Sequence, residues 1–303
     1  MDYLLQTKEV SKSFGGKIAV DHVSLGVKKG DIYGFIGENG AGKTTLMRMA
    51  CGLAKATSGE IILFGSHDLV SQRHRMGCTI ENPALYPSMT AMENMEAQRL
   101  LLGIKDEKVS EKLLDTVGLS RTGKKKAKNF SLGMKQRLMI ALSLLGDPEL
   151  LVLDEPTNGL DPMGIKEVRD LFLHLNEDRD MTILISSHIL GELEKIATRY
   201  GIISNGKMVD EFQADELSTR CGKNLLIYAN DPRQTKEIIS HMFADALCEQ
   251  TPENAIRLKG HLEDAGHINT QLVNAGITVN ALIPEGESLE DYFMSLMGGK
   301  KRA

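Results

Sequence analysis

The chain has 303 residues, of which 42% are hydrophobic and 25% charged, and its formal net charge is −5. This composition is ordinary for a folded globular protein with room for one large and one small domain, and the negative balance argues against a nucleic-acid partner. Four scattered cysteines without a C-x-x-C pair argue against a zinc site or a disulfide framework. The sequence lacks an apolar run near the roughly 20 residues of a membrane span, so we expect any membrane role to come through a partner.

The first 36 residues alternate short apolar runs with turn signals such as FGGK and KKGD. This pattern predicts a small antiparallel sheet that leads into the strand IYGFIG at 32–37. A helix is expected over 46–51, and GEIILFG at 59–65 predicts a further strand.

A complete phosphate-loop motif, GENGAGKT, lies at 37–44 between that strand and that helix. Glycines let successive backbone N–H groups point at phosphate oxygens, and the helix N-terminus adds partial positive charge. Lys43 brings a charge to the β- and γ-phosphates, and the Thr44 hydroxyl is a ligand for Mg²⁺. The alternative is a glycine-rich turn ahead of a helix. The expected nucleotide contacts are Gly37, Glu38, Asn39, Gly40, Ala41, Gly42, Lys43, Thr44 and Thr45.

A helical pattern runs from about 82 to 145, and two apolar strands follow at 150–156 and 181–188 with a helix over 161–177 between them. The first strand ends in Asp154, which we expect near Mg²⁺, and Glu155 is placed to act as general base on a water. The second strand ends in His188, which faces the ligand crevice at the carboxyl edge of a parallel sheet. The alternative for His188 is a capping or surface histidine.

The pattern of apolar and polar residues changes after residue 217. Strands at 224–229, 246–250, 254–258 and 277–282, with helices at 231–243 and 262–275, predict a small ferredoxin-like module. A last helix is expected at 288–298. The predicted organisation is an α/β domain over 1–217 with a mixed sheet core, an antiparallel β subdomain and a helical subdomain, followed by an α+β accessory domain over 218–303.

The ordered set Phe14, GENGAGKTT, ENPALYP, FSLGMKQR, LDEPTNGLDP and His188 resembles the ATP-binding subunit of an ABC transporter, over residues 2–217. The resemblance implies a P-loop NTPase fold, ATP and Mg²⁺ as cofactors, and ATP hydrolysis. It places Phe14 on the adenine ring, with core packing as the alternative. It also places Asp161 as the key carboxylate of the loop that runs across a dimer interface.

The same resemblance implies a pair of such domains that closes head-to-tail around two ATPs, as a homodimer or with a paralogous partner. Ser131 and Gly133 then contact the γ-phosphate of the ATP held by the partner. A separately encoded multi-spanning permease is the expected membrane partner, so the chain is expected at the cytoplasmic face of the cell membrane.

Two departures from the family pattern indicate a subgroup. The family signature Leu-Ser-Gly-Gly-Gln is replaced by Phe130-Ser131-Leu132-Gly133-Met134. We interpret this segment as a nucleotide-contacting site that is retained but altered; the alternative is a degenerate site. Glu81 stands where the family usually has glutamine, and it completes an expected metal set of Thr44, Glu81 and Asp154; the alternative is a surface glutamate. Both features resemble ATPases of bacitracin-resistance and lantibiotic-immunity exporters.

Two other functions compete with a transporter motor. A soluble ABC ATPase that acts on ribosomes or DNA would carry two ATPase domains or a long coiled coil, and this chain has neither pattern. A regulatory nucleotide binder without turnover would release no phosphate above background.

Overall fold

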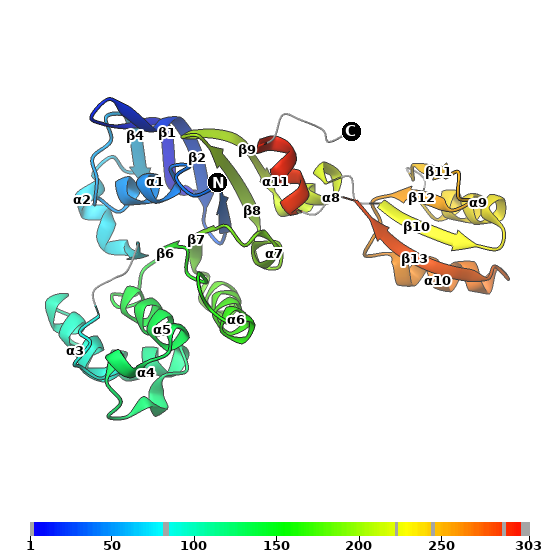
Figure 1. The fold of residues 1–303 in the computed structure, drawn as a ribbon. Coiled ribbons are helices and arrows are strands. Elements are labelled where there is room, and N and C mark those ends of the chain that lie inside the picture. The colour runs from blue at the N-terminus through cyan, green and yellow to red at the C-terminus, as the bar shows by residue number, and fades with distance from the viewer. Residues whose placement is uncertain (1–2, 81–84, 222–223, 244–245, 287–288, 298–303) are drawn as a thin grey trace. The chain divides into compact units, whose positions relative to one another are not determined.

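The computed structural model describes residues 3–80, 85–221, 224–243, 246–286 and 289–297. The chain divides into two compact units, Met1–Ala214 and Asp215–Ala303 (Figure 1). Among the described residues, the first unit contains two sheets and the second contains one. Within the described ranges, every helix is too short or too polar to cross a membrane.

A six-stranded sheet forms the centre of the first unit, in the order β5-β6-β7-β3-β8-β9. Its strands are β3 (Ile32–Ile36), β5 (Met76–Thr79), β6 (Leu150–Asp154), β7 (Thr182–Ser187), β8 (Arg199–Ser204) and β9 (Lys207–Gln213). β9 pairs antiparallel with β8, and the other neighbours pair parallel. Because parallel strands end at one edge of a sheet, the segments that follow β3, β6 and β7 meet there.

A three-stranded antiparallel sheet in the order β2-β1-β4 forms the second layer. It contains β1 (Tyr3–Phe14), β2 (Lys17–Lys28) and β4 (Ser58–Leu63). Gly15 and Gly16 join β1 to β2 with φ values of 54° and 88°, which is the left-handed geometry of a tight hairpin turn. The core between the layers includes Val10, Val20 and Leu25 from this sheet, Met47 and Met49 from α1 (Lys43–Ala50), and Tyr33, Phe35, Val152 and Leu184 from the large sheet. This core supports the segment between β3 and α1.

The first unit also contains α2 (Leu69–Gln72), α3 (Ala91–Leu101), α4 (Val109–Thr116), α5 (Leu132–Ser143), α6 (Pro162–Arg179) and α7 (Leu190–Leu193). The helices α3 to α6 agree with the segments predicted to be helical, whereas the short helices α2 and α7 were not predicted. The helices α3, α4 and α5 pack against one another, in agreement with a helical subdomain (Figure 1). The start of α3 is fixed by a capping box, in which the Thr90 hydroxyl accepts from Glu93 N and the Glu93 carboxylate accepts from Thr90 N.

The second unit has a four-stranded antiparallel sheet in the order β11-β12-β10-β13. The strands are β10 (Asn224–Ala229), β11 (Cys248–Gln250), β12 (Ile256–Lys259) and β13 (Val279–Glu285). The helices α9 (Pro232–Met242) and α10 (Ala265–Asn274) contribute to its core, and α8 (Leu217–Arg220) and α11 (Leu289–Met297) complete the unit. The βαββαβ order and this strand order are those of a ferredoxin-like fold.

Three strands of the large sheet were absent from the prediction. β5 has only four residues, too few for a clear periodic pattern. β8 and β9 form a hairpin whose turn is Asn205–Gly206, with φ values of 48° and 81°. An Asn-Gly pair between apolar runs is a strong hairpin signal, so the sequence did contain the information for this pair.

Candidate nucleotide site

The loop between β3 and α1 has a backbone that only glycine accommodates at two of its positions. A Cβ on Gly37 would lie 2.5 Å from the Ile203 carbonyl oxygen, and one on Gly42 would lie 2.6 Å from the Ala19 carbonyl oxygen. Gly42 also has φ +111° and is the N-cap of α1. The loop is therefore held tightly against β8 and β2, with the N-terminus of α1 at its end. Such a loop fits a phosphate group, because helix N-terminal N–H groups attract anions.

Lys43 lies inside this loop and is only 5% exposed. Its ammonium donates to the Gly37 carbonyl at 2.5 Å and to the Glu38 carbonyl at 3.2 Å. The same nitrogen lies 3.6 Å from Glu155 Oε1. A buried ammonium needs such partners, because an unpaired charge away from water is costly. Lys43 thus joins the loop to the segment that follows β6.

Asp154 is tied to two hydroxyl groups at the ends of neighbouring elements. Thr44 donates to Asp154 Oδ2 at 2.7 Å, and Ser186 donates to Asp154 Oδ1 at 2.6 Å. A hydroxyl and a carboxylate side by side are oxygen ligands of the kind that a hard cation such as Mg²⁺ prefers. Thr44 and Asp154 were expected together from the sequence, and the structure brings them into contact.

Ser186 is a site residue that the sequence analysis did not identify. Its hydroxyl also accepts a hydrogen bond from Glu155 N at 2.9 Å, so it holds both acidic residues. The signal was available in the strand alignment, because Asp154 and Ser186 are partners in the parallel pairing of β6 with β7. Two strands that end in polar residues in register bring those residues together.

Glu155 occupies a backbone conformation with φ +51°, which is strained for a residue with a side chain. Its Oε2 is 2.5 Å from His188 Nδ1. Its Oε1 is buried, faces Lys43, and has no hydrogen-bond partner among the described residues. The His188 side chain is 44% exposed. Glu155 is thus fixed at three points, through its N–H, through His188 and toward Lys43.

Phe14 is the last residue of β1 and is 53% exposed, so the alternative that it packs in the core is wrong. The Lys12 ammonium lies 4.8 Å from the centre of its ring. An exposed aromatic ring at a strand end is available for stacking.

Ser131 and Gly133 lie at the start of α5. Ser131 is the N-cap, and its hydroxyl accepts from Met134 N at 3.3 Å. A Cβ on Gly133 would meet its nearest neighbour, Leu160, at 3.8 Å, which is an ordinary contact. Steric crowding within this chain therefore does not require glycine at position 133. A close contact with the Gly133 backbone would have to come from another molecule.

A surface hollow joins the start of α5 to the start of α6. Residues 131–134 and 159–161 line it from the two sides, distinct from the phosphate loop at 37–44. Asp161 is the N-cap of α6, and its Oδ1 accepts from Gly164 N at 2.9 Å. Pro162 at the first helical position favours the same helix start. Glu81, the third expected metal ligand, lies outside the described residues.

The fold and this cluster define a P-loop nucleotide-binding protein. A family model described as ABC transporter matches residues 20–158. The chain is 43% identical over 302 residues to the bacitracin transport ATP-binding protein BcrA of Bacillus licheniformis, with 99% of each chain covered. It is 43% identical over 212 residues to the lantibiotic transport ATP-binding protein SrtF of Streptococcus pyogenes, which covers 70% of this chain and 92% of that one.

A solved ATP-binding cassette, dimeric in a post-hydrolysis state with ADP and Pi, matches with a TM-score of 0.62. It is 26% identical and covers 69% of this chain and 98% of its own. The chain belongs to the ABC transporter family. It is a nucleotide-binding ATPase subunit of that family, which implies a separate membrane permease as partner.

Proposed function

We propose that this chain is the ATP-hydrolysing motor of an exporter of peptide antibiotics of the bacitracin or lantibiotic type. Support comes from relatives that match nearly the whole chain, the bacitracin transport proteins of Bacillus licheniformis and Enterococcus faecalis. The lantibiotic transport protein SrtF and the linearmycin resistance protein LnrL of Bacillus subtilis add to it. Both features that departed from the family pattern, Glu81 and the FSLGM signature, fit this subgroup.

The observation that carries the hydrolytic part is the connected cluster of Lys43, Thr44, Asp154, Glu155 and His188. We assign Lys43 to the β- and γ-phosphates of ATP, where its charge offsets charge on the transferred group. Glu155 accepts the proton of the attacking water as that water bonds to the γ-phosphorus and ADP leaves. The hydrogen bond from His188 orients the Glu155 carboxylate, and His188 is then close to the γ-phosphate.

Mg²⁺ is proposed at Thr44 and Asp154, with Glu81 as a third ligand. The donor set supports this, because the Thr44 hydroxyl and the Asp154 carboxylate are in contact and both are oxygen ligands. When bound, the ion supplies positive charge that stabilises the phosphate oxygens. Ser186 keeps Asp154 in place through the second carboxylate oxygen.

Pairing with a second ATPase subunit is proposed to complete each site. Ser131 and Gly133 of one subunit would reach the ATP of the other, with Asp161 at the interface between them. The hollow that these residues line is a surface feature away from the chain's own phosphate loop, and the matched cassette in the post-hydrolysis state is dimeric. Phe14 is proposed to stack on adenine. The pair would work at the cytoplasmic face of the membrane, bound to the permease.

A sensitivity assay tests the cargo. A strain with Lys43→Ala is challenged with bacitracin and several lantibiotics, and we expect higher sensitivity to at least one. Lys29→Ala is the matched control and should behave like the wild type, because Lys29 is an ion-paired surface lysine in the turn between β2 and β3, at the opposite end of β3 from the phosphate loop. Unchanged sensitivity to every compound would contradict the proposal that the exporter carries peptide antibiotics of this type. Phosphate release from the purified subunit with its permease tests hydrolysis separately.

A further inference from the structure

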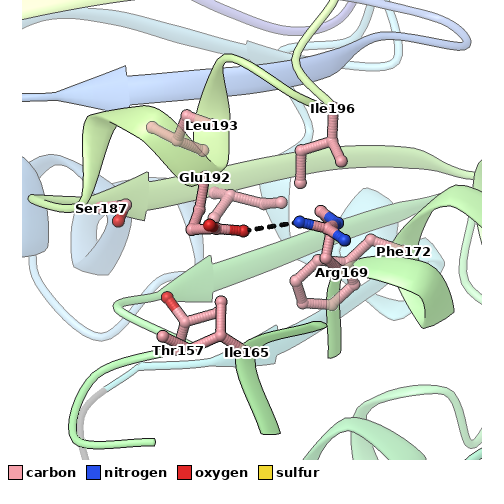
Figure 2. Close-up of a pocket in the computed structure, with 9 residues that line it drawn as sticks. Thr157, Ile165, Arg169, Phe172, Ser187, Glu192, Leu193 and Ile196 are labelled. Atoms are coloured by element: carbon pink, nitrogen blue, oxygen red, sulfur yellow. Dashed lines mark hydrogen bonds and ion pairs between the residues drawn. The ribbon is translucent and has the colours of Figure 1, made fainter. Parts of the chain in front are cut away.

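An ion pair connects the helix that follows the Asp161 loop to the short helix that follows His188. Arg169 on α6 donates through Nη1 to Glu192 Oε2 on α7 at 2.9 Å, and Figure 2 shows the two side chains pointing toward each other. The side chains are 19% and 23% exposed. They line a small pocket together with Ile165, Phe172 and Leu193.

The mostly apolar surroundings make this contact more than a surface ion pair. Exposed pairs contribute little, because water and salt screen them. Here the hydrophobic side chains of α6, β7 and α7 surround the charges. Removal of Arg169 leaves Glu192 paired with Lys195 alone, so the link between the two helices is lost although Glu192 keeps a partner. The contact is therefore expected to resist separation of the two helices.

α7 depends on such contacts for its position. It spans only Leu190–Leu193, and a helix of that length has little stability of its own in water. Its residues Leu190 and Leu193 are buried, and Glu192 forms the ion pair with α6. His188 comes two residues before α7, so a displacement of α7 moves the imidazole.

α6 supplies the fixed side of the contact. It has 18 residues and begins at Pro162, directly after Asp161. Arg169 lies two turns into this helix, where a rigid backbone carries it. The other ion pairs of these residues, Glu192 with Lys195 and Arg169 with Asp170, stay within one segment and do not connect the helices.

We propose that Arg169 and Glu192 are positioning residues for ATP hydrolysis, because their ion pair holds α7 against α6 and keeps His188 in hydrogen-bond contact with Glu155. The inference rests on the roles proposed above for His188 and Glu155. It adds a physical connection between the Asp161 loop and His188. Glu192 is ionised at neutral pH, since hydrogen bonds from Lys195 first, and then Arg169, hold the pKa of its carboxyl below the usual value.

Steady-state kinetics of purified variants give the first test. In Arg169→Ala we expect kcat for ATP hydrolysis to fall about 10- to 100-fold, since misplacement of a positioned group by about 1 Å has effects of that size. KM for ATP should stay within about twofold, because the phosphate loop is unchanged. Arg169→Lys should recover part of the loss. Arg75→Ala is the matched control, since Arg75 pairs with Glu149 at 2.6 Å just before β5, and it should keep the wild-type kcat.

A double-mutant cycle and a crystal structure separate positioning from general stability. Under single-turnover conditions, Arg169→Ala should cause no further loss in a His188→Ala background. In the crystal structure of Arg169→Ala, the distance from His188 Nδ1 to Glu155 Oε2 should exceed about 3.5 Å. Losses that multiply in the double variant, or an intact His188–Glu155 contact, would overturn the inference. A wild-type protein without turnover would instead refute the proposed hydrolytic roles, and the crystal structure would still test the positioning.

Discussion

Replacement of Ser186 by alanine tests the geometry that joins the two acidic residues of the site. Ser186 is fully buried at the end of β7. Its hydroxyl donates to the Asp154 carboxylate at 2.6 Å and accepts from Glu155 N at 2.9 Å. Alanine removes both hydrogen bonds and leaves the fold of the strand unchanged. The effect should therefore fall on stability and on hydrolysis together.

The magnitude follows from the two bonds. A hydrogen bond to a charged group contributes about 1.5–3 kcal/mol, and a buried N–H that loses its partner costs about 1–3 kcal/mol. The Thr44 hydroxyl still holds Asp154, which keeps the loss near the lower ends of these ranges. We expect about 3 kcal/mol less stability for the first unit, or a melting temperature roughly 6–12 °C lower for a unit of this size.

Differential scanning calorimetry measures this change as a shift of the melting temperature. Ser187→Ala is the matched control for stability, since it removes the same group from the next residue. Among the described residues that hydroxyl accepts one hydrogen bond, from Ile189 N at 2.9 Å, and its loss should cost about 1 kcal/mol. We also expect kcat to fall at least tenfold in Ser186→Ala. A Ser186→Ala protein that is as stable as Ser187→Ala and keeps the wild-type kcat would refute the reasoning.

Three further predictions concern the same unit. Glu155→Gln should lower the hydrolysis rate at least about 10²-fold and yield a dimer with Mg-ATP on gel filtration; a monomer at saturating Mg-ATP would count against pairing. Gly42→Ala should abolish nucleotide binding in calorimetry, because its Cβ would meet a backbone carbonyl at 2.6 Å, whereas Gly40→Ala adds only backbone strain of about 1–2 kcal/mol; equal affinities would contradict this. The Cys51 thiol lowers the pKa of Cys78 to about 7 through a hydrogen bond. Iodoacetamide should therefore label Cys78 rapidly above pH 7, and Cys51→Ala should slow labelling at pH 7 because the thiolate fraction falls; unchanged rates by mass spectrometry would exclude the effect.

Helices and strands were predictable from the sequence where the run of apolar residues is long enough to show a helical or strand pattern. The strands at 150–156 and 181–188 and the helix at 161–177 agree with β6, β7 and α6 because long apolar runs and caps mark them. β5 was missed since its four residues carry no period. The hairpin of β8 and β9 was not predicted, although its turn Asn205–Gly206 is a signal that the sequence contains.

The site was predictable where a motif fixes the chemistry and less so where partners come from distant segments. Lys43 and Thr44 follow from the phosphate-loop pattern alone. Ser186 required knowledge of strand register, which depends on how β6 and β7 pair in space. The contact between Arg169 and Glu192 joins two helices that are separated in sequence, and charge pattern along either helix does not reveal it.

The left-handed backbone of Glu155 sets stability against the function proposed for this position. A side chain at φ +51° opposes folding, by about 1–2 kcal/mol relative to glycine. Glycine at 155 would relieve this strain, but it would also remove the carboxylate that we propose as general base. Glu155 is therefore a position where the more stable protein and the hydrolysing one require different amino acids.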